Sequence, residues 1–286
     1  MLRFPKALAL ALVATLGIGA CAPTAQNTAQ SLAQEQRAAQ QFVSQLEAKD
    51  KLIKDRSLNN YVSGIVGKIW AQRPRGAVPL RSYIIKDADV NAFTPGGGYV
   101  FVNAGLLAAM ENEAQFASVI AHEIAHIDRG HIQAGRGARQ GAQIGAALGQ
   151  IAGAALGVPT GVTDLVVGVG ASAAVSSFTR TQERDADQSG IRYLAGAGYN
   201  AMEGARSFEV LKRLYGDRGG FLASHPASSE RQATLNQMAQ QLGATKGRIA
   251  EKTYDSRTRK IRRQVLQFYE QAGRDREAAQ IRRNLR

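Results

Sequence analysis

The stretch VIAHEIAHIDRGH, from Val119 to His131, decides how the rest of the chain is interpreted. The chain of 286 residues has four histidines, and three of them fall in this stretch. His122 and His126 are four positions apart, so on an α-helix their side chains share one face. Two imidazoles one helical turn apart can bind one zinc ion, and Glu123 is placed to activate a water molecule there. We therefore predict a catalytic zinc site on a helix.

The residues around these histidines predict that the helix is buried. Phe116, Ile120 and Ile124 place apolar side chains around the motif. A polar surface helix with two exposed histidines would not be expected to have them. Asn112, followed by Gln115 three positions later, resembles a capping box. The helix should therefore begin at this point and carry the histidines into the core.

A catalytic zinc needs a third protein ligand, which can be His131, His225 or a carboxylate. His131 is five positions beyond His126, which turns it away from the shared face. In TQERDADQSG (181–190), Glu183 and Asp187 are four apart on a predicted helix. Glu183 could bind the metal while Asp187 accepts a hydrogen bond from a ligand histidine. The alternative is that both acids are merely solvated.

Together, HEIAH and ERDAD resemble the signature of the gluzincins related to the CAAX prenyl endopeptidase and the HtpX heat-shock peptidase. Three further segments, IGAC (18–21), DVNAFTPGGGYVFVNAGLL (89–107) and SHPASSERQATL (224–235), resemble the periplasmic LoiP/BepA-like branch of that family. The resemblance implies a zincin-like α+β fold, mostly α, with one zinc ion per chain. It also implies that Glu183 is the third ligand, that Asp187 supports a ligand histidine, and that His131 is not a ligand.

The segment GGYVFVN (97–103) has the composition of a β-strand. It looks like the edge strand on which such peptidases bind an extended substrate by main-chain pairing. Gly97, Gly98, Tyr99, Val100 and Phe101 are the residues predicted to bind substrate. Tyr99 and Phe101 should face the same side of the strand, where packing in the core is the alternative.

His225 is expected to contribute to catalysis. Relatives bring a histidine of an SHP loop toward the metal, where it could donate a hydrogen bond to the developing oxyanion. It could instead bind the zinc as a fourth ligand and hold the site closed. A histidine simply packed in a loop is the third interpretation.

The N-terminus resembles a lipoprotein signal. Arg3 and Lys6 precede a short apolar run, and the IGAC sequence ends at Cys21. Cleavage before Cys21 and acylation of this cysteine would anchor the protein in a membrane. Lipoproteins that stay at the inner membrane would be expected to have Asp after the acylated cysteine. This chain has Ala22 there, which favours the outer membrane, on the periplasmic side. Cleavage after Ala20 without lipidation is the alternative.

The formal net charge of +13 is unevenly distributed. Residues 246–286 hold 13 Lys and Arg against 5 Asp and Glu, which accounts for +8. Nucleic-acid binding would rest on this tail alone, and export argues against it. Contact of the tail with anionic lipid is a better explanation of its charge than nucleic-acid binding. Most such basic segments, however, simply form a solvated helical face.

Four parts of the chain are expected: a signal peptide (1–20), a tether (21–30), a metallopeptidase domain (31–245) and a basic helical tail (246–286). Within the domain, glycine recurs at every fourth position from Gly141 to Gly161. This pattern predicts a tight helical hairpin over about 140–178 that packs on protein. Membrane contact and an unstructured loop are the alternatives.

The sequence thus predicts a zinc-dependent endopeptidase of the bacterial cell envelope. Its substrates would be unfolded or misassembled polypeptides, outer-membrane proteins above all. The alternative from a different functional class is an assembly chaperone or scaffold whose zinc site is largely latent.

Overall fold

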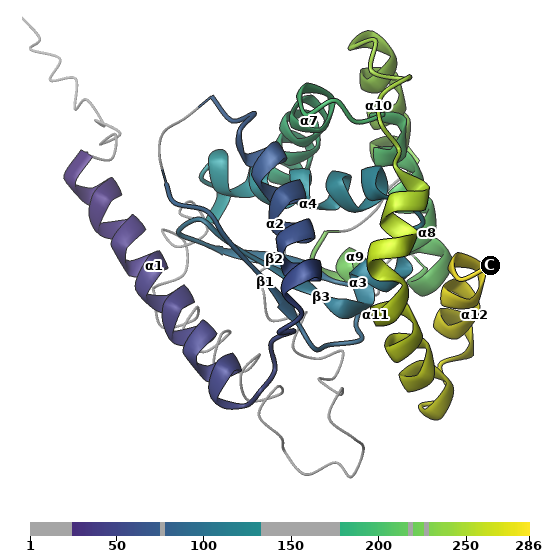
Figure 1. Ribbon diagram of the computed structural model, residues 1–286. Coiled ribbons are helices and arrows are strands. Elements are labelled where there is room, and N and C mark those ends of the chain that lie inside the picture. The colour runs from purple at the N-terminus through teal and green to yellow at the C-terminus, as the bar shows by residue number, and fades with distance from the viewer. Residues whose placement is uncertain (1–24, 75–77, 133–177, 217–219, 226–228) are drawn as a thin grey trace, which may run out of the picture.

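The computed structural model describes residues 25–74, 78–132, 178–216, 220–225 and 229–286. Over these residues the chain is mostly helical with one small sheet, which confirms the predicted α+β fold (Figure 1). The predicted lipidation site Cys21, the signal peptide and residues 140–177 of the predicted glycine-striped hairpin lie outside the described residues. No helix within the described ranges is both long and apolar enough to cross a membrane.

Among the described residues, helices come first and last, and three strands follow the second helix. Helix α1 begins inside the segment predicted as a tether. The elements are α1 (Ala25–Ala48), α2 (Arg56–Trp70), β1 (Arg81–Ile85), β2 (Ala92–Gly96), β3 (Tyr99–Asn103), α3 (Ala104–Ala109), α4 (Glu113–Asp128), α7 (Arg180–Gly196), α8 (Met202–Tyr215), α9 (Phe221–Ser224), α10 (Ser229–Gln241), α11 (Glu251–Gln271) and α12 (Asp275–Asn284).

The sheet has the strand order β1-β3-β2. Strand β3 pairs in parallel with β1 and antiparallel with β2, so it lies in the centre. The prediction that residues 97–103 form an edge strand is therefore wrong. Gly96, Gly97 and Gly98 have positive φ angles of 95°, 65° and 83°, which form the tight turn that folds β2 back onto β3. Pro95 lies in β2, where a missing N–H is tolerated because β2 is an edge of this sheet.

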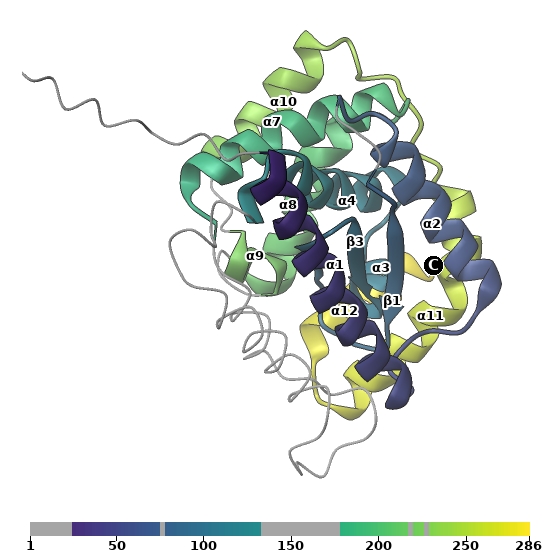
Figure 2. The ribbon, with the colours of Figure 1, turned by 90° about the vertical axis from the view of Figure 1, so that its left-hand side faces the viewer.

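Helix α1 lies across one face of the sheet (Figure 2). The Phe42 ring of α1 is 5.0 Å from the ring of Phe101, centroid to centroid. Tyr99 and Phe101 do face the same side, but they are 2% and 0% exposed in the core beneath α1. The Gly97 N–H donates to Oε2 of Glu35 in α1 at 2.7 Å. Gly97, Tyr99 and Phe101 are therefore packed against α1. Strand β3 is paired on both sides, so it offers a substrate no free strand edge.

Helices α2 and α4 cover the opposite face of the sheet, where Ile84, Val100 and Val102 are almost fully buried. Helix α4 packs on the edge strand β2, while α2 packs on β1. The predicted histidine helix is thus buried between the sheet and the later helices, next to the strand edge.

Residues 246–286 form α11 and α12, joined by a turn at Gly273 as predicted. Tyr254 and Tyr269 in α11 are fully buried and join the main hydrophobic core. Arg262 is 1% exposed and donates to the carbonyl oxygen of Met110 at 2.8 Å. The helical tail is therefore packed into the same core as the preceding residues rather than separate from them.

Candidate active site

Helix α4 begins where the sequence predicts. The Asn112 side chain accepts a hydrogen bond from the Gln115 N–H at 2.9 Å. The Gln115 side chain does not complete the box, because it accepts from the Glu111 N–H instead. This cap satisfies one of the unpaired N–H groups at the start of a helix that is buried for almost its whole length.

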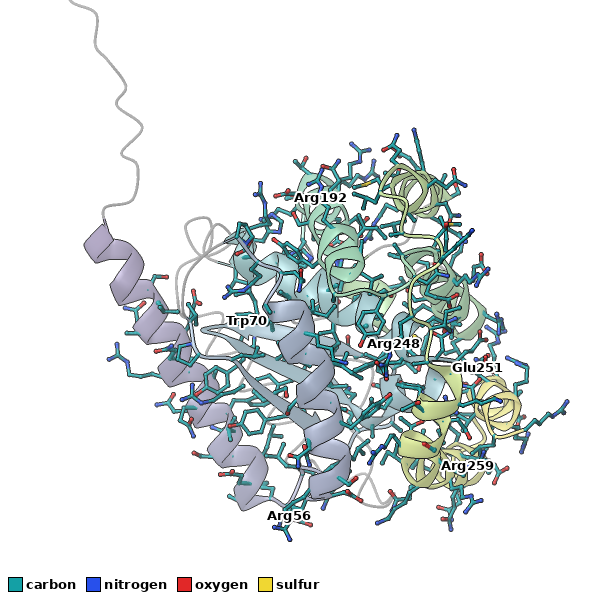
Figure 3. The ribbon with its side chains drawn as sticks, turned by 45° about the horizontal axis from the view of Figure 1, so that its top comes forward. Arg56, Trp70, Arg192, Arg248, Glu251 and Arg259 are labelled. Carbon is teal, nitrogen blue, oxygen red and sulfur yellow. The ribbon has the colours of Figure 1, made fainter. Side chains whose placement is uncertain are left out.

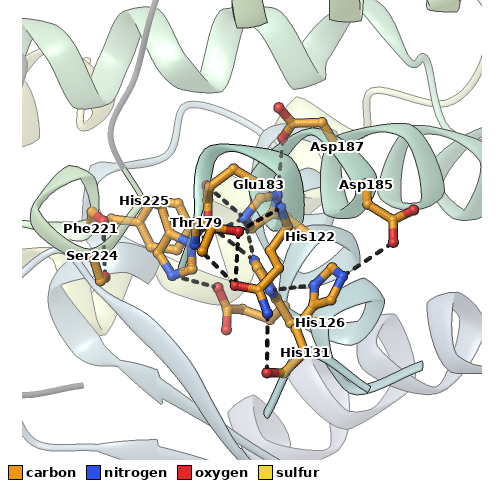
Figure 4. Close-up of polar contacts among 12 residues, drawn as sticks. His122, His126, His131, Thr179, Glu183, Asp185, Asp187, Phe221, Ser224 and His225 are labelled. Atoms are coloured by element: carbon orange, nitrogen blue, oxygen red, sulfur yellow. Dashed lines mark hydrogen bonds and ion pairs between the residues drawn. The ribbon is translucent and has the colours of Figure 1, made fainter. Parts of the chain in front are cut away.

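His122 and His126 face the same side of α4, toward α7 (Figure 4). Their Nε2 atoms are 3.0 Å apart. His122 is 6% exposed, while His126 and Glu123 are 0% and 1% exposed. The three residues of the motif therefore come together in a site that excludes most solvent.

Helix α7 brings Glu183 to the histidines. Thr179 caps this helix with a complete capping box, accepting from the Gln182 N–H at 3.2 Å. A Cβ on Gly190 would lie 3.1 Å from the backbone nitrogen of His122, so glycine permits the close approach of α7 to α4. Glu183 Oε1 lies 3.3 Å from His126 Nε2. Its Oε2 atom lies 3.5 Å from His122 Nε2.

His225 follows α9 and is 2% exposed. Its Nδ1 atom lies 3.1 Å from His122 Nε2 and 2.9 Å from Glu183 Oε1. Its Nε2 atom points to Glu123, 3.3 Å from Oε1. The ring stacks on Phe221 with centroids 4.3 Å apart. His225 is therefore fixed between the metal-facing groups and Glu123.

His122, His126, Glu183 and His225 each present one donor atom to a common centre, and these atoms all lie within 4.8 Å of one another. The distances given above for five of the six pairs run from 2.9 to 3.5 Å, and the sixth pair, His126 and His225, lies within the 4.8 Å limit. Donor atoms bound tetrahedrally to zinc at about 2.0 Å are separated by about 3.3 Å. Three imidazole nitrogens and one carboxylate at these distances therefore fit a single metal ion.

Asp187 lies one turn after Glu183, and its Oδ1 atom is 3.0 Å from Nδ1 of His122. Arg231, which the sequence reasoning missed, contacts both acids and is 7% exposed. Its Nε and Nη2 atoms donate to Asp187 at 2.6 and 2.8 Å, and Nη1 is 2.8 Å from Glu183 Oε2. This buried guanidinium offsets part of the negative charge of two buried carboxylates.

The ionisation of the cluster follows from burial and from neighbouring charges. Burial alone would lower the pKa of His122, but Glu183 and Asp187 raise it to about 9. Burial also opposes ionisation of Glu183, but His225 and His122 bring its pKa well below the ordinary value. Burial raises the pKa of Glu123, although His225 and His122 offset part of this effect. Glu183 is thus an ionised acceptor, while Glu123 is more basic than an exposed glutamate.

His131 lies beside the cluster and not in it, as predicted. Its Nδ1 atom is 3.0 Å from Nδ1 of His126, on the side of that ring away from the donor centre. Burial lowers the pKa of His131, with Asp185 offsetting part of the effect. His131 thus contacts a metal-facing histidine without itself facing the centre.

Two histidines on a buried helix, a glutamate from a second helix and a further glutamate beside the first histidine are the pattern of a metallopeptidase of the zincin type. The family model described as peptidase family M48 matches residues 53–239, more than half of the chain. The chain belongs to peptidase family M48. The metallopeptidase class predicted from the sequence is therefore confirmed, and the cluster is the metal-binding site of this family.

Named relatives agree with this assignment. The beta-barrel assembly-enhancing protease of Escherichia coli (strain K12) is 27% identical over 279 residues, which cover 91% of this chain and 57% of that protein. The metalloprotease LoiP of Escherichia coli (strain K12) is 31% identical over 156 residues, 54% of this chain and 60% of LoiP. The mitochondrial metalloendopeptidase OMA1 of Arabidopsis thaliana is 31% identical over 155 residues, 54% of this chain and 30% of OMA1. The chain thus spans 60% or less of the length of these relatives.

Proposed function

We propose that the chain is a zinc-dependent endopeptidase of the bacterial cell envelope, which hydrolyses peptide bonds in unfolded or misassembled outer-membrane proteins. The buried cluster of four donor atoms beside Glu123 is the observation that carries the proposal. The name of one relative, a protease that enhances beta-barrel assembly, supports the substrate class, and the name of the other, a metalloprotease, supports the reaction.

His122, His126 and Glu183 are proposed to bind one zinc ion per chain. Zinc is favoured because imidazole nitrogen and carboxylate oxygen in a four-coordinate arrangement are its usual ligands in peptidases. Asp187 would orient His122 through its Nδ1 atom, 3.0 Å away.

Catalysis would depend on Glu123 as general base and then general acid. Zinc, when bound, supplies Lewis-acid activation of water and of the scissile carbonyl. Glu123 accepts the proton of the attacking water and delivers it to the leaving amine. Its burial keeps bulk water away from the carboxylate and raises its pKa, although the neighbouring His225 offsets part of this rise.

His225 has two possible roles. If its Nε2 atom donates to the oxyanion, the His225→Ala variant should be less active. If its Nδ1 atom is a fourth ligand that closes the site, the same variant should be more active. The position of Nδ1, 2.9 Å from Glu183 and 3.1 Å from His122 Nε2, supports the closing role in this arrangement.

The substrate backbone is proposed to pair with β2 in place of β3. Strand β2 is an edge of the sheet and packs on α4, the helix that carries the motif. Pairing through main-chain groups would recognise extended, unfolded segments with little dependence on side chains.

The protein is proposed to be periplasmic and held at the outer membrane by acylated Cys21. Part of the basic tail would add contact with anionic lipid. Arg262 and Arg274 make internal contacts. The side chains of Arg259 (Figure 3) and Lys260 are 43% and 78% exposed, although they pair with Asp255 and Asp55. Tail-dependent binding to phosphatidylglycerol vesicles that is lost at high salt would support this contact.

The endopeptidase proposal is tested with casein and an unfolded outer-membrane protein as substrates. We expect the wild type to cleave them and to contain zinc. Glu123→Gln should keep the zinc but lose cleavage, and Glu183→Ala should lose both. Equal cleavage by wild type and Glu123→Gln, or no cleavage by either, would contradict the proposal.

An assembly chaperone or scaffold is the second candidate. The convergence of His225 with the three proposed ligands favours it, because a fourth ligand leaves no position for water. In that case Glu123→Gln should prevent aggregation of an unfolded outer-membrane protein as well as the wild type does, while the wild type cleaves none of it.

A further inference from the structure

His131 and Asp185 lie next to the metal-facing cluster, where neither has a role so far. His131 is 6% exposed, and its Nδ1 atom is 3.0 Å from Nδ1 of His126. The other ring nitrogen of His131, Nε2, is 3.1 Å from Oδ2 of Asp185 in α7. Asp185 also accepts a hydrogen bond from Nε of Arg129 at 2.8 Å. These contacts form a chain from the surface to a metal-facing ring (Figure 4).

The chemistry of the chain decides where its hydrogens are. An ionised carboxylate only accepts, so Nε2 of His131 carries the hydrogen that Asp185 accepts. In a neutral imidazole the other nitrogen is an acceptor, so Nδ1 of His131 accepts from Nδ1 of His126. His126 is then left with an unprotonated Nε2, and this is the atom that lies 3.3 Å from Glu183 Oε1.

We propose that His131 and Asp185 are positioning residues that fix the tautomer and the ring orientation of His126. The proposal rests on the proposed function, because it concerns a proposed zinc ligand. Phe178 stacks on the His126 ring with centroids 3.7 Å apart, which restrains the plane of the ring. Stacking alone does not decide which edge of the His126 ring faces the cluster. The contact between His131 and Nδ1 does decide it, because it holds the opposite edge.

The arrangement around His126 parallels that around His122. Nδ1 of His122 lies 3.0 Å from Asp187, and Asp187 is in turn held by Arg231. Asp185 and Asp187 are two positions apart on α7, the helix that also carries Glu183. Helix α7 would thus supply the ligand Glu183 and also anchor both histidines of α4. Asp187 contacts His122 directly, whereas Asp185 acts on His126 through His131.

The proton positions are measured on the full wild-type chain loaded with zinc. Four histidines are few enough for two-bond proton–nitrogen NMR spectra to resolve each ring. We expect His131 to carry its hydrogen on Nε2 and His126 on Nδ1. A His131 protonated on Nδ1 would overturn the proposal, since it could not accept from His126.

Zinc affinity tests the same proposal by substitution. His131→Phe keeps the ring volume but removes the acceptor, and we expect it to raise the Kd for zinc about 10- to 100-fold. Asp185→Asn should raise the Kd in the same direction. Glu230→Gln is the matched control, because it breaks another ion pair of α7, that with Arg184 at 3.1 Å, without touching a histidine. The Kd of Glu230→Gln for zinc should equal that of the wild type.

The outcomes separate this proposal from the proposed function. Zinc binding by folded His131→Phe as tight as by the wild type would overturn the role of His131 and leave the zinc site intact. A wild type without affinity for zinc would overturn both. If His131→Phe does not fold, as judged by circular dichroism, the proton positions in the wild type decide the question.

Discussion

At the scale of single residues, the sequence predicts those site residues whose spacing along the chain places them on the same face of a helix. His122 and His126 must share a face because they are four apart on a helix, and Glu183 with Asp187 follows the same rule. Arg231 has no such signal, because it lies in a polar stretch where burial is not expected. The charge of the site could have indicated it, since two buried carboxylates need a nearby cation.

We expect Arg231→Ala to lower the free energy of unfolding by about 3–5 kcal/mol, because it leaves Asp187 and Glu183 buried without their cation. Arg231→Lys should recover part of this loss, since lysine cannot reproduce the bidentate contact. Urea denaturation of the metal-free protein measures both. Arg184→Ala, which removes an exposed arginine paired with Glu230, should change stability by less than about 1 kcal/mol. Equal effects of the two alanine variants would show that the buried contact is not important for stability.

At the scale of elements, caps and periodicity predict the long helices, but not how the elements pack. The segment AFTPG (92–96) has a proline and a glycine, so its composition does not indicate β2, although Pro95 is what an edge strand tolerates. Helix α3 is apolar throughout and has no helical periodicity to detect. The strand order, and with it which strand lies at the edge of the sheet, depends on β2, which the sequence did not predict.

The distance between α4 and α7 is a property of the helix pair, and Gly190 sets it. In Gly190→Ala the new Cβ would lie 3.1 Å from backbone atoms of Ala121 and His122, so α7 must move away. We expect a loss of about 1–3 kcal/mol in unfolding free energy. We also expect weaker zinc binding, because Glu183 moves with α7.

Gly64→Ala in α2 is the matched control for this prediction. A Cβ at Gly64 would meet nothing within 4 Å, so the better helix propensity of alanine should stabilise the protein by about 0.5–1 kcal/mol. Thermal unfolding and zinc titration measure both variants. A Gly190→Ala protein as stable as Gly64→Ala would mean that the two helices are not in tight contact.

At the scale of the whole molecule, the C-terminal segment shows the limit of composition. Its charge of +8 suggests a solvated tail, yet Tyr254, Ile261, Val265 and Tyr269 recur at helical spacing and are buried. The hydroxyl of Tyr269 donates to the carbonyl oxygen of Ala88. The next residues of that loop lead to the site, because Val90 accepts from the N–H of Phe221, which stacks on His225. The last helices therefore help to hold a loop that supports the site.

This loop should also make the stability of the whole protein depend on pH. Burial, with the nearby charge of Asp89, raises the pKa of Asp87 from 3.8 to about 8. The folded protein then binds a proton that the unfolded chain has released, so stability falls as pH rises from about 4 to about 8. The Asp87→Asn variant has no charge at this position, but its amide oxygen keeps the acceptor for the Asp89 N–H, which lies 2.8 Å from Oδ1 in the wild type. Relative to this variant, the wild type should lose on the order of 1 kcal/mol or more between about pH 5 and about pH 8, measured by urea denaturation.

Asp50→Asn is the control for the pH dependence, because it removes a carboxylate whose pKa is shifted in the opposite direction. Hydrogen bonds from Lys54 and Lys86 lower the pKa of Asp50 to about 2. The stabilising contribution of Asp50 is therefore lost only in acid and stays constant between about pH 5 and about pH 8. Wild type and Asp50→Asn should accordingly give parallel profiles over this range, whereas wild type and Asp87→Asn should diverge. Parallel profiles for the wild type and Asp87→Asn would instead show that Asp87 is ionised in the folded protein at neutral pH, so that burial beside Asp89 does not hold its proton.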